Sequence, residues 1–307
     1  MKVAPVLLFL SAAISPLTLP LLFAQDNNAA QQPDFGYLAV RREPAEWPTP
    51  ETLVSQLRSS DDRVRFSAMH LIGLTDKQAY HSIWAQTSPT KVIGQKLVKP
   101  DDIRLMYAAL GLDSTQQAVI AVLDTEGQMV YAAVGVPTAT GWKRIAVLDY
   151  WCKYEMYNGQ DTIGESIQFH PAPQSSPTNP QRFELVLRAS GGGTGVYTQN
   201  EFHFRVRDGQ LVDVVSFVSR HRNGCETGPA CEHLEARWFY PNAVQGKPGG
   251  LLVTAQADFN PTDTQRVDWD IRELQNRHLR SAECESYEWK EAAFRYTTVG
   301  KETLCPN

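Results

Sequence analysis

The sequence has 307 residues, of which 42% are hydrophobic and 21% are charged, and its formal net charge is −5. This composition is typical of a globular protein and excludes a wholly disordered chain. Lys and Arg form no block longer than a pair such as Arg41-Arg42, so the concentrated basic surface of most nucleic-acid binders is missing and we expect no nucleic-acid partner.

Residues 1–24 have the pattern of an export signal. Lys2 supplies the positive start, the run from Val6 to Ile14 the apolar centre, and Ala24 the small residue at the cut. An uncleaved membrane anchor is the alternative, and the prolines within the segment argue against it. We therefore expect a periplasmic or extracellular protein whose mature chain has no membrane span. Residues 25–50 are rich in Gln, Asn, Ala and Pro and predict a flexible lead-in.

Residues 51–112 predict a small helical segment. Two helices are expected at 51–58 and 63–74, with an N-cap within Ser60-Asp61-Asp62, and a third, short helix at 100–109. In the run 57–74 an Asp is followed by Val64-Arg65 and then by Ala68 and Leu71, and this resembles the core of a HEAT-type repeat. The resemblance covers residues 51–75, and no second copy follows at the expected spacing of about 40–47 residues. It therefore implies one helical hairpin packed on the rest of the chain, while the concave protein-binding surface of that family needs more units.

Residues 117–307 predict an antiparallel β domain, so the expected fold class is α+β. About ten runs show the period of two that marks strands, and the domain is a sandwich, a barrel or a curved meander. The clearest hairpin turn is Asp208-Gly209. Prolines within 170–181 predict a loop. Charged residues at alternate positions are expected to face outward, among them Arg205, Arg207, Glu235 and Arg237.

Five cysteines lie in the mature part, and an oxidising compartment favours disulfides. Cys225 and Cys231 bracket a turn-rich loop, and Cys284 and Cys305 flank a C-terminal hairpin, so these two pairs are the expected bridges. Four cysteines allow three pairings, and the connectivity stays open. Cys152 is expected to be a buried, unbridged thiol.

A metal site is the alternative use of two of these cysteines. His221, Cys225, Cys231 and His233 gather ligands suited to tetrahedral zinc around one loop. Their spacing matches no familiar zinc pattern, and a disulfide would consume the sulfur ligands. We expect the disulfide, no metal and no cofactor.

Two features could contact a ligand. The run Gly191-Gly192-Gly193-Thr194 could offer converging backbone N–H groups, although a wide hairpin turn or bulge also demands glycine. The aromatic residues of the strand region could stack on sugars or could pack in the core, and Trp142 is the one most expected to be exposed.

No hydrolase motif is present, neither Gly-x-Ser-x-Gly nor His-Glu-x-x-His nor Ser-x-x-Lys. The sequence therefore favours a noncatalytic binding or structural module with an unidentified ligand or protein partner. The alternative is a hydrolase whose active residues are dispersed over the β domain. A cleft that joins a carboxylate to His203, His221 or His233 would favour the enzyme, and a filled β core would favour the binder.

Overall fold

The computed structural model describes residues 38–83, 99–112, 115–124, 128–152, 161–172, 182–193, 196–223, 231–239, 249–259 and 279–302. All of them belong to one unit, Pro33–Asn307. The expected signal region lies outside the described residues. Within those residues, every helix is too short or too polar to cross a lipid bilayer.

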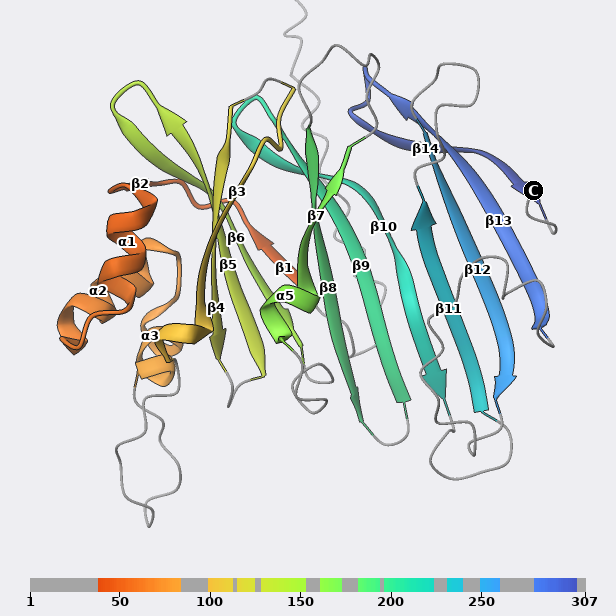
Figure 1. Cartoon of the computed structure of the whole chain (residues 1–307), viewed down its shortest axis with the longest axis horizontal. Coiled ribbons are helices and arrows are strands. Elements are labelled where there is room, and N and C mark those ends of the chain that lie inside the picture. The colour runs from red at the N-terminus through yellow and green to blue at the C-terminus, as the bar shows by residue number, and fades with distance from the viewer. Residues whose placement is uncertain are drawn as a thin grey trace, which may run out of the picture. The chain divides into compact units, whose positions relative to one another are not determined.

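Figure 1 shows the elements along the chain. The helices are α1 (Pro50–Leu57), α2 (Asp62–Leu71), α3 (Asp76–Ile83) and α5 (Thr162–Ser166), with a 3₁₀ turn at Pro100–Asp102. The strands are β1 (Leu38–Arg41), β2 (Ala45–Trp47), β3 (Ile103–Ala108), β4 (Gln117–Asp124), β5 (Met129–Thr138), β6 (Gly141–Trp151), β7 (Ile167–Pro171), β8 (Phe183–Gly193), β9 (Val196–Arg207), β10 (Gln210–Asn223), β11 (Cys231–Phe239), β12 (Gly249–Phe259), β13 (Leu279–Lys290) and β14 (Arg295–Glu302).

The first six strands form sheet A. Its order is β1-β6-β5-β4-β3, with β2 also paired to β6, and all its pairs are antiparallel. Every residue of β4 is buried, because both faces of the sheet are covered. This explains why β4 reads as a continuous apolar run instead of alternating with polar residues.

One face of sheet A carries the helices. Leu53 and Leu57 of α1 and Met69 of α2 share a buried cluster with Ile120 and Val122 of β4. The helix starts follow from their caps, since Thr49 accepts from the N–H of Thr52 and Asp61 accepts from the first N–H groups of α2. The likeness of this hairpin to a HEAT-type unit stays a prediction.

The remaining strands form sheet B, in the order β14-β13-β12-β11-β10-β9-β8-β7. Each strand pairs with its neighbour in the chain, so sheet B is an antiparallel meander. At the β9–β10 turn, Asp208 and Gly209 have φ angles of 51° and 70°. The expected hairpin at Asp208-Gly209 is confirmed, and antiparallel β structure is confirmed for the described part of 117–307.

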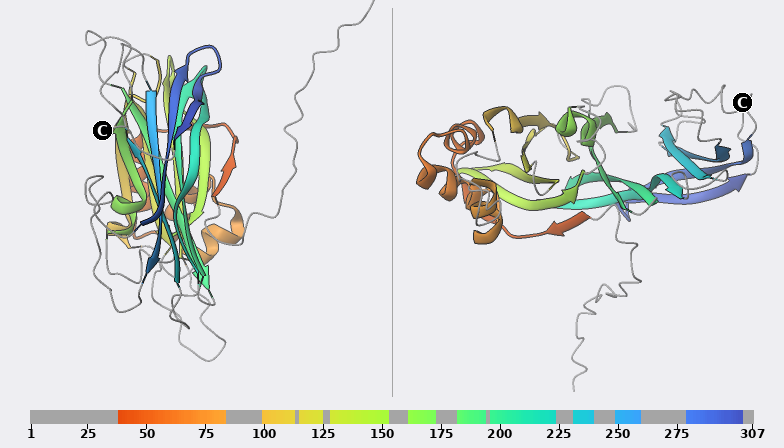
Figure 2. Two further views of the ribbon diagram at one scale, coloured as in Figure 1. Left: turned by 90° about the vertical axis from the view of Figure 1, so that its right-hand side faces the viewer. Right: turned by 90° about the horizontal axis from the view of Figure 1, so that it is seen from below.

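The other face of sheet A packs on one end of sheet B. A single buried cluster joins Val119, Ala121 and Leu148 of sheet A to Leu187 and Phe204 of sheet B. Backbone hydrogen bonds tie residues 109–110 to β8 and β9, from Phe183 N to Ala109 O at 2.9 Å and from Val206 N to Leu110 O at 2.8 Å. Figure 2 shows the helices beside sheet A, at the end away from β11–β14.

Sheet B is strongly curled. Six strand-to-strand steps separate β14 from β8, which in a flat sheet would be about 29 Å at roughly 4.8 Å per step. Nevertheless the hydroxyl of Tyr296 on β14 donates to Glu184 on β8 at 2.7 Å. The curl therefore closes one face of the sheet over its own side chains, and this enclosed face contains the candidate site.

Three expectations about secondary structure were wrong. Residues 103–108 form strand β3 and not a helix, because alternate residues face the two cores on either side of sheet A. Residues 38–47 of the expected lead-in form β1 and β2, whose three or four residues are too few to show a period. The loop expected over 170–181 begins later, since 167–171 form the edge strand β7, which ends at Pro171.

Candidate functional site

His203 lies between two glutamates on the enclosed face of sheet B. Its Nδ1 is 3.0 Å from Oε2 of Glu184, and its Nε2 is 2.9 Å from Oε1 of Glu201. The side chains of His203 and Glu184 are 0% exposed and that of Glu201 is 7% exposed. We call these three residues the Glu–His–Glu cluster.

The strand pattern brings the cluster together. Glu201 and His203 are two residues apart on β9 and therefore share a face. On β8, Val186 is the cross-strand partner of His203, so Glu184 lies on the same face and close by. The opposite face of the same strands, with Leu185, Leu187 and Phe204, packs against sheet A.

A second shell holds the two carboxylates. Arg188, directly opposite Glu201 in the register, donates from Nε to its Oε2 at 2.7 Å. Tyr296 donates to Oε1 of Glu184, so both oxygens of that carboxylate are engaged. Arg188 also donates to Gln168 of β7 at 3.2 Å. Each carboxylate thus bonds a group from another strand, which fixes its orientation.

The geometry makes His203 a cation at neutral pH. Both ring nitrogens face carboxylate oxygens, and only the imidazolium can donate from both. Burial alone would lower the pKa of His203, but the hydrogen bonds and charges of Glu184 and Glu201 outweigh it and raise the pKa to about 9. Burial likewise opposes ionisation of Glu201, yet the bond from His203 and the charge of Arg188 lower its pKa to about 2.

Aromatic rings cover the cluster from the other strands of sheet B. The ring centroids of Phe217 and Trp238 lie 5.9 Å and 5.8 Å from that of His203. Trp238 in turn packs edge-on against Tyr287 at 5.1 Å and Tyr296 at 4.9 Å. This apolar cover keeps water away from the charges and so strengthens their attraction.

The chemistry open to this arrangement is limited. A general base must accept a proton near the working pH, and a general acid must hold one. His203 holds a proton on each nitrogen, but both are donated to carboxylates and are not directed at a substrate. The lowered pKa of Glu201 makes it a poor base near neutral pH. The cluster therefore acts as a buried ion-pair clamp between β8, β9 and β14.

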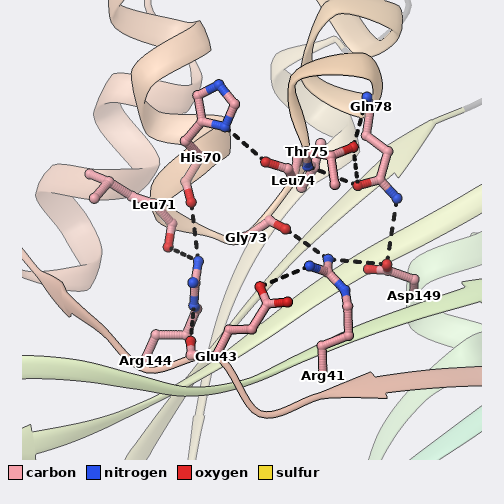
Figure 3. A network of polar contacts seen from close by, with 10 residues as sticks. All are labelled: Arg41, Glu43, His70, Leu71, Gly73, Leu74, Thr75, Gln78, Arg144 and Asp149. Atoms are coloured by element: carbon pink, nitrogen blue, oxygen red, sulfur yellow. Dashed lines mark hydrogen bonds and ion pairs between the residues drawn. The ribbon is translucent and has the colours of Figure 1, made fainter.

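Figure 3 shows a second polar cluster, which joins sheet A to the helices. Arg144 of β6 donates to three backbone oxygens, those of Glu43 at 2.8 Å, His70 at 3.1 Å and Leu71 at 2.7 Å. Arg41 of β1 donates to Gly73 O at 2.7 Å and to Asp149 at 3.1 Å. The bonds to His70 O and Leu71 O engage carbonyls at the end of α2, and with the bond to Gly73 O they fix the helices on the sheet.

Sequence reasoning selected different residues for ligand contact. Gly191 and Gly192 are buried at the end of β8 and pair with Thr198 and Tyr197. Gly193 ends the strand opposite Val196, and Thr194 lies outside the described residues. Their position fits the hairpin interpretation, and a ligand role for them stays a prediction.

Trp142 is less accessible than the sequence suggested. It is half-buried in β6 and packs at the edge of the helix-facing core, with its ring 6.1 Å from that of Tyr107. Trp151, at the end of the same strand, is 38% exposed.

The structure describes the side chains of two of the five cysteines, Cys152 and Cys284. Cys152 is buried and unbridged, as expected, and its thiol donates to Gln128 O at 3.3 Å. Cys284 is 1% exposed and disulfide-bonded, and its partner lies outside the described residues. Cys225, Cys305 and the side chain of Cys231 also lie outside, so the pairing stays a prediction.

Of the four residues in the zinc alternative, only His221 has a described side chain. His221 is half-buried and bonded through Nδ1 to the Thr198 hydroxyl at 3.0 Å, whereas Cys225 and the side chains of Cys231 and His233 lie outside the described residues. In the described part of the chain, no group of three or more His, Cys, Asp or Glu side chains could hold a metal ion.

Charged residues that alternate with apolar ones on two neighbouring strands are a signal for the Glu–His–Glu cluster, which the patterns of the single strands did not reveal. Glu184 and Arg188 alternate with apolar residues on β8, as Glu201, His203 and Arg205 do on β9.

In the comparisons with known proteins, no family model, no curated protein and no solved structure matches the chain.

Proposed function

We propose that this chain is an exported, noncatalytic binding module whose ligand surface belongs to sheet B. One observation carries the proposal: the sheet brings His203 together with two glutamates, yet all three are enclosed and bonded to one another. A catalytic histidine needs a nitrogen that can exchange a proton with substrate. Here both nitrogens are engaged by carboxylates.

The rest of the enclosed face supports binding. Its aromatic residues from β10, β11, β13 and β14 pack into one wall over the cluster. A rigid wall supported by a buried ion pair is preorganised, and preorganisation lowers the entropic cost of holding a ligand. The clamp therefore serves the shape of the sheet, and the ligand is not chemically changed.

The competing function is a hydrolase with dispersed active residues. The test is a panel of chromogenic esters, glycosides and phosphates at several pH values, run with the mature chain and with His203→Gln and Glu201→Gln. We expect no turnover above that of heat-denatured protein. Turnover that is lost in a folded Glu201→Gln variant, as judged by its circular dichroism, would establish the hydrolase.

Binding itself is tested by thermal shift against neutral sugars, peptides and small acids. A ligand that binds only the native state raises its stability as its concentration exceeds the dissociation constant. We expect at least one class of ligand to raise the melting temperature in a concentration-dependent, saturable manner. A panel without any such shift would contradict the binding function.

Export is part of the proposal, and the bonded state of Cys284 supports it, since disulfides persist in oxidising compartments. Thiol counting under denaturing conditions tests it. With Cys152 unbridged and the other four paired, we expect one thiol before reduction and five after. Five thiols before reduction in protein from its native compartment would contradict both the bridges and export.

A further inference from the structure

Arg205 of β9 is a buried cation for which the described residues supply no hydrogen-bond acceptor. The sequence suggested an outward position, yet the residue is 3% exposed. Its guanidinium forms no hydrogen bond and no ion pair with any described residue, and its Nε is fully enclosed. Removing a charge from water without a partner costs several kcal/mol. The Nη atoms also have no acceptor among the described residues, yet they are not among the enclosed atoms without a partner, so they are not fully enclosed.

The neighbours of Arg205 do not neutralise it. The guanidinium carbon lies 4.6 Å from the ring centre of Trp289 and 5.3 Å from that of Phe294. Such contacts attract the cation to the ring faces, but the rings offer its N–H groups no acceptor oxygen. Glu184 acts on its charge, but both oxygens of that carboxylate are taken by His203 and Tyr296.

The charge balance of the cluster leaves Arg205 in excess. Glu184 and Glu201 contribute two negative charges, and His203 and Arg188 contribute two positive charges, so these four residues are balanced. Arg205 adds one positive charge to the same face. The exposed Glu291 is near enough to act on it, but its carboxylate accepts from Trp289 Nε1 at 2.6 Å.

Two further arginines lie around the same place. Arg182, just before β8, has its Nε enclosed without an acceptor among the described residues. Burial lowers the pKa of Arg205, Glu184 opposes this, and the charge of Arg182 adds to it, so the two guanidinium groups repel each other. The guanidinium carbon of Arg207 also lies over the Phe294 ring, 5.2 Å from its centre. Arg207 pairs with Asp208 and donates to Ala292 O, so the enclosed Nε groups here without an acceptor among the described residues are those of Arg205 and Arg182. Two such cations close together favour the binding of an anion.

We infer that Arg205 and Arg182, flanked by Arg207, bind the oxyanion group of a small ligand, which is a carboxylate, a phosphate or a sulfate. A guanidinium presents paired N–H donors that match two oxygens of such a group, while its flat face stacks on an aromatic ring. Trp289 and Phe294 occupy that flat face, so the N–H edge remains for the anion. This inference rests on the proposed binding function and adds the chemical class of the ligand.

The test is the affinity of the full mature chain for phosphate, sulfate and benzoate, measured by calorimetry and thermal shift at constant ionic strength with chloride as the reference anion. Hydrogen bonds from a guanidinium to an oxyanion are charge-assisted and stronger than those between neutral groups. We therefore expect Arg205→Met to bind the preferred anion at least about 10-fold more weakly than the parent chain. The matched control is Arg63→Met, at an exposed position on α2, which should bind with unchanged affinity.

A second readout separates binding from a structural role. Without anion, Arg205→Met should melt at or above the temperature of the parent chain, because an unpaired buried charge has been removed. With saturating anion the order should reverse. A lower melting temperature of Arg205→Met without anion, or an unchanged affinity, would overturn the inference.

The outcome also distinguishes this inference from the binding function itself. If a neutral sugar or peptide shifts the parent chain and Arg205→Met equally and no oxyanion binds, the binding function stands and the oxyanion site falls. If His203-dependent turnover is found, the noncatalytic function falls whatever the anions do.

Discussion

His203 ties stability to pH at the scale of one residue. Its pKa is raised to about 9 in the folded state, against about 6.5 when unfolded. The folded state therefore holds this proton more tightly. The stabilisation, on the order of 3 kcal/mol, is fully present below about pH 6.5 and is lost as pH rises through about 9. Glu201 acts on the acid side: its lowered pKa of about 2 stabilises the fold above about pH 4.5, and this is lost as pH falls toward 2.

We expect His203→Gln to lose several kcal/mol of unfolding free energy near pH 6, because it leaves two buried carboxylates without their cation. The loss should shrink steadily by pH 9.5, where the parent histidine has released its proton. Urea denaturation at a series of pH values measures this. His221→Gln, at a half-buried histidine bonded to Thr198, is the control and should cost little at each pH. A penalty for His203→Gln that is equal at pH 6 and pH 9.5 would refute the assignment of an imidazolium.

Gly73 and Gly209 show two reasons why a position requires glycine, a positive φ angle and a lack of space for a side chain. Both have positive φ angles, 96° and 70°. A Cβ on Gly73 would lie 2.3 Å from Cγ2 of Val147, whereas one on Gly209 would meet nothing within 4 Å. We expect Gly209→Ala to cost about 1 kcal/mol for its backbone angle alone. Gly73→Ala should cost about 3 kcal/mol, since overpacking adds to the same backbone cost. Urea midpoints of the two variants give the comparison, and equal costs would contradict the crowding at Gly73.

At the scale of elements, Arg144 seats the end of α2 on sheet A. It donates to the carbonyls of His70 and Leu71 at the end of α2 and to that of Glu43 between β1 and β2 (Figure 3). The carbonyls of His70 and Leu71 also accept from Gly73 N and Trp47 Nε1. Hydrogen bonds from a charged donor contribute about 1.5–3 kcal/mol each. We expect Arg144→Met to lose about 3 kcal/mol or more of unfolding free energy. Amide hydrogen exchange should speed up more in residues 68–74 than in β8 and β9.

Arg63→Met is the matched control for that variant, since Arg63 is exposed on the same helix. It removes the same charge and should leave both the unfolding free energy and the exchange rates within experimental error. If Arg144→Met behaves like Arg63→Met, the three carbonyl bonds do not hold the helix.

The sequence predicted the elements whose signals are local. Alternation along 183–188 and 202–207 predicted β8 and β9, and Asp208-Gly209 predicted the turn that follows, as observed. The same alternation placed Glu184, Glu201 and His203 opposite the apolar residues. It could not show that this second face is also covered, because the cover comes from β10, β11, β13 and β14, up to 112 residues away in the chain. Arg205 was expected outside for this reason.

Elements that depend on long-range pairing were missed. β1 and β2 are strands only because β6 offers them an edge, and their own residues carry no period. The residues of β3 are compatible with a helix or a strand, and pairing with β4 makes the segment a strand. β4 is buried on both faces and lacks alternation as well, yet the β domain expected from residue 117 included it.

At the scale of the whole molecule, the two sheets should unfold together. One buried cluster contains residues from β4–β6 and from β8–β10, and Phe204 lies within it at 2% exposure. Removing a buried phenyl ring costs about 3–5 kcal/mol. We expect Phe204→Ala to lower the unfolding free energy by that amount and to speed slow hydrogen exchange in β4–β6 as much as in β8–β10, because neither sheet keeps a complete core without the other.

Val299→Ala is the control, since Val299 on β14 is 57% exposed and its truncation should leave stability within about 0.5 kcal/mol. Tryptophan fluorescence and far-ultraviolet circular dichroism should follow one coincident urea transition in the parent chain and in both variants. Two separate transitions, with Phe204→Ala shifting only the one that reports on sheet B, would mean that sheet A is stable by itself. The shared cluster would then be a contact between independent units, and the curl of sheet B would have to hold the Glu–His–Glu cluster without help from sheet A.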